Sequence, residues 1–323
     1  MSGSLGEVTR VFPAALNIKG DWQLLQKSGH LVRHWSRHQV CHLCRATRAG
    51  DLSFTNMLPT APWRQTVQDA PLPWPVEYPP AWARIPGFTA VSLSLDILHA
   101  WHLGLGSAFA GSSIRKMCDA GLFGPRPLAR QLQHAWDDFT SHVAPVKPAL
   151  DSFECSLPGK KRKAWAVLPS KGSDATLVTR WIAAKLAATE LPTLHLIMLS
   201  TCAWGFDTAL RGLSQEGVFV PAAAAKQISQ QFALALQAYT WLSHDALAQQ
   251  KRHFKELPKA HFLAHIAMRL GEATDDAPVW NPLIDSCWGD EDFVGRVSRL
   301  SRRTHPRTAA KRCIQRYLLS LAT

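Results

Sequence analysis

The chain has 323 residues, of which 46% are hydrophobic, so it is long enough to form one large domain or two. Its 36 Lys and Arg against 24 Asp and Glu give a formal charge of +12, which favours a polyanionic partner, either nucleic acid or an anionic membrane surface. No apolar run approaches the roughly 18 residues that cross a bilayer, and the first ten residues do not resemble a signal peptide. We therefore expect a soluble, intracellular protein with no membrane partner.

The predicted elements begin with a short buried strand over 14–18, which ends at a Gly20-Asp21 turn. A short helix interrupted at Gly29 is expected next, followed by a loop that carries two cysteines. Residues 51–86 are rich in Pro and Trp and have little periodicity, so they should form an irregular excursion. Alternating, β-branched residues then predict a strand over 88–96.

Helical patterns dominate the rest of the chain. A helical tendency over 99–109 is followed by the helices expected over 127–143, 175–188, 191–213, 221–254, 290–300 and 308–321. A basic loop at 159–163 separates two of them, and its Lys-Lys-Arg-Lys run is either a phosphate contact, a nuclear import signal or plain solvated loop. The sequence thus predicts a helix-rich protein.

Cysteine and histidine pairs at metal-ligand spacing predict a zinc site. Cys41 and Cys44 supply two thiolates, but two further ligands are needed for a tetrahedral ion. His261 and His265 are spaced i,i+4, so on a helix they project from one face and can complete a Cys₂His₂ set. The alternatives are unpaired buried thiols with surface histidines, or a redox-active Cys pair, which the absence of a surrounding βαβ pattern disfavours.

Carboxylates mark two further candidate positions. Asp96 and His99 lie at a predicted strand-to-helix junction, where Asp96 is either a functional group or a helix N-cap. Glu291 lies within the acidic run 290–292 at a predicted helix start, where it either holds a divalent metal or simply complements the helix dipole.

The C-terminal segment is the clearest charge asymmetry, because no acidic residue follows Asp292. Such a basic run favours contact with DNA phosphates, with a solvated helix face as the alternative. The candidate DNA-binding residues are Arg296, Arg299, Arg302, Arg303, Arg307, Lys311 and Arg312.

Taken in chain order, these motifs resemble a cut-and-paste DDE transposase of the CACTA and Plavaka type. Gly20-Asp21 is similar to the segment that carries the family's second catalytic Asp, the two cysteines to its Cys-x-x-Cys, and Asp96 with His99 to its Asp-x-x-His. The histidines of 261–265 resemble the family's late histidines, and the segment from Glu291 to Gly295 resembles the helix that carries its third acid. The resemblance covers roughly residues 12–321.

The resemblance implies a partial RNase H-like α/β core over 1–110, a helical insertion over 111–280 and C-terminal helices over 281–323. It also implies Mg²⁺ or Mn²⁺ at Asp21 and Glu291 as catalytic residues, a DNA partner and a nuclear location, with homo-oligomerisation left open. Two departures predict lost strand-transfer activity: the twenty residues before Asp21 contain no Asp, and Asp292 stands where the family has Arg. The alternative is a helical, zinc-stabilised nucleic-acid or protein interaction module without enzymatic activity.

Overall fold

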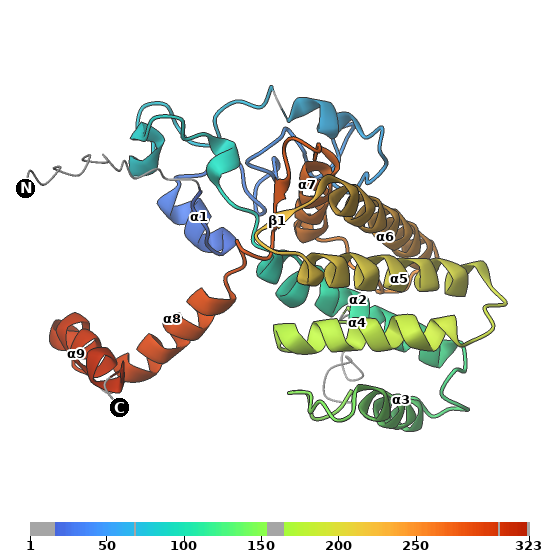
Figure 1. Ribbon diagram of the computed structural model, residues 1–323. Coiled ribbons are helices and arrows are strands. Elements are labelled where there is room, and N and C mark those ends of the chain that lie inside the picture. The colour runs from blue at the N-terminus through green and yellow to red at the C-terminus, as the bar shows by residue number, and fades with distance from the viewer. Residues whose placement is uncertain (1–16, 68, 154–164, 303, 322–323) are drawn as a thin grey trace, which may run out of the picture.

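The computed structural model describes residues 17–67, 69–153, 165–302 and 304–321, and helices dominate them (Figure 1). The helices are α1 (Trp22–Ser28), α2 (Gly106–Asp119), α3 (Leu128–Val143), α4 (Gly172–Ala187), α5 (Leu194–Gln215), α6 (Ala222–Ala248), α7 (Pro258–Gly271), α8 (Trp288–Ser301) and α9 (Ala309–Leu321). A π-helical segment, Leu98–Leu105, leads into α2, and two short strands, β1 (Phe219–Val220) and β2 (Val279–Trp280), pair antiparallel. The prediction of a helix-rich protein is confirmed.

The helix boundaries follow from local chain chemistry. Asp21 caps α1 by accepting from the backbone N–H of Leu24, and Gly29 ends this helix where the sequence predicted an interruption. The helix predicted over 221–254 is real but shorter, since α6 ends at Ala248. Gln250 and Phe254 have φ values of 57° and 51°, and this left-handed backbone cannot continue a right-handed helix.

The strand predicted over 88–96 is wrong for most of its length. A capping box between Thr89 and Ser92 folds Ala90–Ser92 into a 3₁₀ turn, in which the Thr89 N–H donates to the Ser92 hydroxyl. Within the described part of the expected sheet, one parallel bridge remains, between Ile18 and Leu93. Residues 14–16 of the other predicted strand lie outside the described residues.

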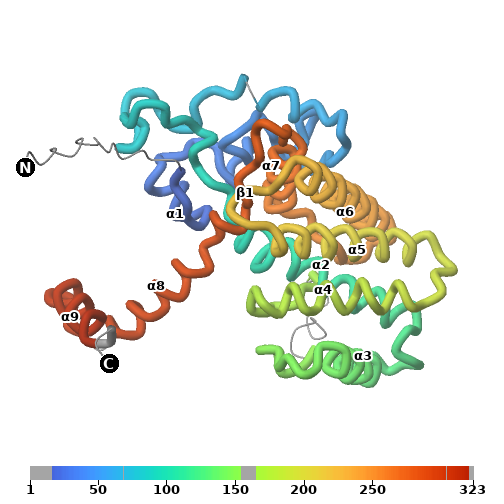
Figure 2. Tube along the Cα trace, viewed as in Figure 1, coloured from blue at the N-terminus to red at the C-terminus, as the bar shows by residue number. Residues whose placement is uncertain are grey.

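The core lies among α4, α5, α6 and α7, which pack side by side beside α2 (Figure 2). Aromatic side chains fill it, as where Trp101 packs against Phe206 with ring centroids 4.2 Å apart. Buried residues of the loop that follows α1, including Val40 and Trp63, belong to the same hydrophobic cluster as α7. The irregular N-terminal loops are therefore packed directly onto the helical body.

The C-terminal helices α8 and α9 pack against each other and extend away from the helical body (Figure 1). The chain around the start of α8 is tied to the segment before α1, because the Asn17 amide donates to Asp285 over 2.7 Å and Lys19 pairs with Asp290 over 2.9 Å. These contacts bring the start of α8 to the start of α1. None of the helices in the described ranges is long and apolar enough to cross a bilayer.

Candidate metal centres

The two cysteines lie in a tight bend whose backbone points at their sulfurs. The N–H of Leu43 donates to the Cys41 Sγ over 3.3 Å, and that of Ala46 donates to the Cys44 Sγ over 3.4 Å. Both side chains are fully buried. Backbone donors of this kind stabilise thiolates, which are the form of cysteine that binds metals.

Helix α7 supplies the two imidazoles, as the i,i+4 spacing predicted. The Nε2 atom of His261 lies 3.2 Å from the Cys44 Sγ, and the Nε2 atom of His265 lies 3.4 Å from the Cys41 Sγ. The two Nε2 atoms are themselves 3.1 Å apart. Because α7 is buried in the core, its histidines face the cysteine bend and not solvent.

These distances fit one tetrahedral ion. Ligand atoms about 2.0–2.3 Å from a common metal lie about 3.3–3.8 Å from one another, close to the observed separations. All four ligand atoms lie within 4.8 Å of one another. Cys41, Cys44, His261 and His265 can therefore hold a metal ion, as the sequence analysis expected.

An indole and a guanidinium group lie beside this Cys₂His₂ cluster. Trp63 packs edge-on against His261 at 4.2 Å and also contacts His265. Arg33, which is 3% exposed, donates to the carbonyls of His42 and Pro71 and lies near both sulfurs. Its positive charge favours the thiolate forms of the cysteines.

The pKa values of the two cysteines in the cluster are shifted in opposite directions. Burial raises the pKa of the Cys41 thiol, but Cys44 and the two imidazoles outweigh it and leave this pKa well below its ordinary value. The pKa of Cys44 is raised by its hydrogen bond with Cys41 and by burial. Burial lowers the pKa of His261, which keeps the neutral imidazole that metals require.

A second cluster forms at the junction of α1, the π-helical segment and α8. It contains Asp21, His99 and Glu291, whose ligand atoms also lie within 4.8 Å of one another. Asp21 stands at the N-terminus of α1, and Glu291 lies in the first turn of α8. The Nε2 atom of His99 is 3.5 Å from a Glu291 carboxylate oxygen, and the Glu291 side chain is 50% exposed. This carboxylate–histidine cluster is therefore open to solvent.

Asp96 orients His99 within this cluster. One carboxylate oxygen binds His99 Nδ1, and the other accepts from the backbone N–H groups of Leu98 at 2.9 Å and Cys287 at 3.1 Å. Burial raises the pKa of Asp96, but these hydrogen bonds outweigh it and leave the pKa below its ordinary value. The bond to Asp96, together with the charge of Glu291, raises the pKa of His99. A carboxylate on one imidazole nitrogen that leaves the other for a metal is the usual arrangement around metal-bound histidines.

The candidate DNA-binding residues lie on α8 and α9 and on the turn between them. The side chains of Arg296, Arg299, Arg302, Arg307, Lys311 and Arg312 are exposed, whereas Arg303 and the basic loop 159–163 lie outside the described residues. Sequence reasoning named His99 but did not join it to Asp21 and Glu291. The sequence contained one signal for this cluster, the i,i+3 spacing of Asp96 and His99, which lets the carboxylate reach the imidazole.

The fold and its sites thus define a helix-rich protein with a buried Cys₂His₂ cluster that can hold a metal ion. Comparison with known proteins found no matching family model, no matching curated protein and no matching solved structure.

Proposed function

We propose that this chain is a transposase-derived DNA-binding protein with structural zinc in the Cys₂His₂ cluster and a Mg²⁺ or Mn²⁺ site at Asp21 and Glu291. The observation that carries the proposal is the approach of Asp21, His99 and Glu291 to within 4.8 Å. Two of these residues lie near opposite ends of the chain, and the transposase resemblance required their carboxylates to meet. A helical module with purely structural Cys and His residues has no such requirement.

Zinc is favoured in the Cys₂His₂ cluster by the ligand chemistry. Two thiolates and two imidazoles in a tetrahedral arrangement are a preferred zinc set, and all four positions are filled by protein, which is typical of a structural site. Oxygen ligands at Asp21 and Glu291 instead favour a hard divalent cation such as Mg²⁺ or Mn²⁺. The first site thus offers two thiolates and two imidazoles, whereas the second offers two carboxylates and the imidazole of His99.

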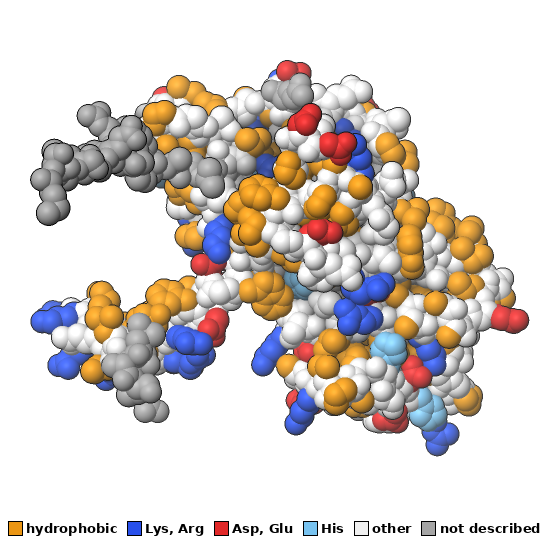
Figure 3. Space-filling view, in the orientation of Figure 1, with side chains coloured by type: hydrophobic (Ala, Val, Ile, Leu, Met, Phe, Trp, Pro, Cys, Tyr) orange, Lys and Arg blue, Asp and Glu red, His pale blue; other side chains and the backbone are white. Residues whose placement is uncertain are grey.

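DNA is favoured as the partner by the charge that follows Glu291 along its own helix. Exposed cationic side chains cover α8 and α9 beyond the first turn of α8, and Figure 3 shows them on the extended C-terminal helices. A DNA backbone bound by these side chains can run towards the carboxylate–histidine cluster at the other end of α8. Phosphate contacts of this kind supply affinity and orientation without reading sequence.

The proposed core is a partial RNase H-like one, supported by the parallel bridge between Ile18 and Leu93 that places the segments bearing Asp21 and Asp96 side by side. The proposed activity is DNA binding without strand transfer. Asp96 does not add a third carboxylate for metals, because its oxygens are committed to His99 and to backbone N–H groups. Asp292 adds negative charge where the resembling family carries Arg.

The test is the salt dependence of duplex binding. Replacing Arg299, Arg302 and Arg307 with Gln should remove up to three phosphate contacts and reduce the slope of log K against log salt by about 3. The matched control replaces Arg130, Lys147 and Lys226, which are exposed cations on or near other helices, with the same change in net charge. Equal slopes for the two triple variants would overturn the proposed DNA surface.

A protein interaction module is the second candidate, because α9 exposes apolar side chains as well as basic ones. Ile314, Leu318 and Leu319 are each about 60–70% exposed. An exposed apolar stripe on an amphipathic helix is typical of helix-mediated association. This candidate gains support if the wild-type protein shows no salt-dependent DNA binding.

A further inference from the structure

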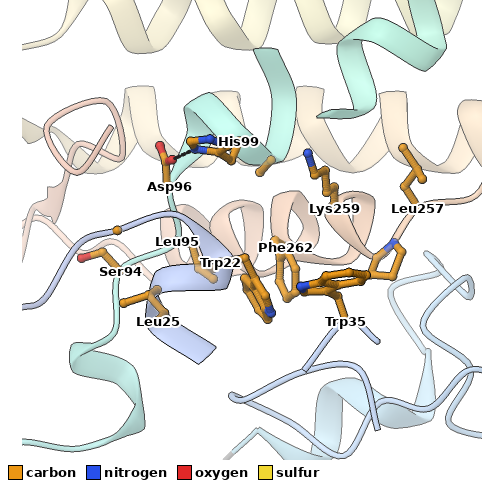
Figure 4. A pocket seen from close by; sticks show the side chains of 13 residues that line it. Trp22, Leu25, Trp35, Ser94, Leu95, Asp96, His99, Leu257, Lys259 and Phe262 are labelled. Atoms are coloured by element: carbon orange, nitrogen blue, oxygen red, sulfur yellow. Dashed lines mark hydrogen bonds and ion pairs between the residues drawn. The ribbon is translucent and has the colours of Figure 1, made fainter. Parts of the chain in front are cut away.

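An apolar pocket of about 300 Å³ opens directly beside the carboxylate–histidine cluster. Asp96 and His99 belong to its wall, so the pocket shares His99 with the carboxylate–histidine cluster. Figure 4 shows Asp96 and His99 on one side of the pocket, with Trp22, Phe262 and Trp35 on the other. Lys259 also lines it and donates to the carbonyl of Leu103 over 3.2 Å.

The aromatic wall of this pocket presents flat ring faces. Trp22 stacks on Phe262 with ring centroids 3.7 Å apart and an angle of 26° between the planes. Trp35 is 44% exposed and lines the pocket, so part of its ring is open to a ligand there. The Nε1 of Trp22 is buried and has no hydrogen-bond partner among the described residues.

We propose that this pocket binds a nucleobase that has been unstacked from the DNA held by the chain. The inference rests on the proposed function, because it needs a DNA strand at the carboxylate–histidine cluster. Every nucleobase offers a π face for aromatic stacking, and a cavity of this volume has room for one base. The phosphates attached to a base in this pocket would lie near Lys259 and the carboxylate–histidine cluster, because Lys259 and His99 both line the pocket.

Charge favours a base over the apolar side chain of a protein partner. The wall contains Lys259, and His99 paired with Asp96, and the chain carries a formal charge of +12. The positive charge of Lys259 and of the whole chain attracts a phosphate-linked ligand, whereas a neutral peptide side chain has no such attraction. Unstacking a base costs a few kcal/mol in a duplex and much less in a single strand, so single-stranded DNA should show the effect most clearly.

The experiment compares two oligonucleotides of about 15 nucleotides, one of thymidine and one of abasic tetrahydrofuran units with the same phosphates. Fluorescence anisotropy gives Kd for wild type, Trp35→Ala, Trp35→Phe and Trp204→Ala. Trp204 is the matched control, because it is 49% exposed on α5 and does not line the pocket. Wild type should bind the thymidine strand about 5-fold to 100-fold more tightly than the abasic strand.

Trp35→Ala should remove most of this preference and leave abasic binding unchanged, whereas Trp35→Phe and Trp204→Ala should keep it. Photo-crosslinking of a strand that contains 5-iodouracil should then label the peptide with Trp22 or Trp35. Equal binding of both strands by wild type, or crosslinks at Trp204, would overturn the base pocket and leave the DNA-binding proposal standing. Absence of binding to either strand and to duplex would overturn both proposals.

Discussion

The two metal-ligand clusters of this protein differ most in their burial. The Cys₂His₂ cluster joins a loop after α1 to the buried helix α7, and each of its residues is at most 3% exposed. The carboxylate–histidine cluster joins the start of α1 to the start of α8, and its Glu291 side chain is 50% exposed. Both clusters bring together residues far apart in the sequence, but only the first is enclosed by the core.

This difference indicates different roles. A closed site with four protein ligands contributes to folding, because its ligands meet only in the folded chain. A site open to solvent leaves coordination positions for water or a phosphate oxygen, and its ions exchange readily. We therefore expect the stability of this protein to depend on the ion at the first site and its ligand binding to depend on the ion at the second.

The largest expected effect comes from removing one ligand of the buried site. Cys41→Ser should reduce bound zinc from about one equivalent to near zero, and the lost ion and the uncompensated thiolate should lower Tm by about 10 °C or more. Metal content by mass spectrometry and a thermal melt measure both effects. Cys118→Ala is the control, since Cys118 is equally buried but lies on α2, outside the cluster. Unchanged zinc in the Cys41 variant would exclude the assigned ligand set.

A smaller effect is expected at the open site, on binding and not on folding. Glu291→Gln removes a charged ligand and should weaken Mn²⁺ binding about 10-fold, with zinc content and Tm nearly unchanged. Electron paramagnetic resonance titration of Mn²⁺ measures the affinity. Asp292→Asn is the matched control, because Asp292 lies on the same helix and pairs with Arg296 over 2.9 Å outside the cluster. If both variants lost the same Mn²⁺ affinity, the loss would come from reduced negative charge and not from a missing ligand.

The closed site could be predicted from sequence because its signals are local. The Cys-x-x-Cys bend and the i,i+4 histidines each fix a pair of ligands, and one metal chemistry suits both pairs. Long periodic helices such as α5 and α6 were predicted for the same reason. The end of α6 was missed, since nothing in the residue pattern marks the left-handed backbone at Gln250 and Phe254.

The open site could be predicted only in part, because it depends on contacts between distant segments. Asp21 and Glu291 were joined in one site only by a resemblance, and His99 was left apart from them. No local sequence pattern predicts the hydrogen bond from Asn17 to Asp285 or the stacking of Trp22 on Phe262. The wrong strand over 88–96 has a similar cause. Its alternating residues favour a strand, but the capping box at Thr89 and Ser92 stabilises a 3₁₀ turn instead.

The smallest expected effect comes from Asp138, which lies outside both clusters. Its ion pair with Lys185 shows how much a pair without a metal contributes to stability. It accepts from the Trp181 indole over 2.7 Å and from the Lys185 ammonium over 2.9 Å. Burial raises the pKa of Asp138, but these two hydrogen bonds outweigh it and lower this pKa below the ordinary value. Asp138→Asn should therefore lower the free energy of unfolding by about 1 kcal/mol at pH 7.

The pH dependence of that loss follows from the direction of the shift. A carboxylate whose pKa is lower in the folded than in the unfolded chain adds stability above the unfolded pKa of about 3.9, and this stability is lost as pH falls through the folded pKa. In urea unfolding, the free energies of unfolding of wild type and Asp138→Asn should therefore become equal as the pH falls below about 4. A difference in free energy of unfolding that grows on acidification would contradict a lowered pKa for Asp138 in the folded chain. Added Mn²⁺ should leave this difference unchanged, because Asp138 belongs to neither metal-ligand cluster.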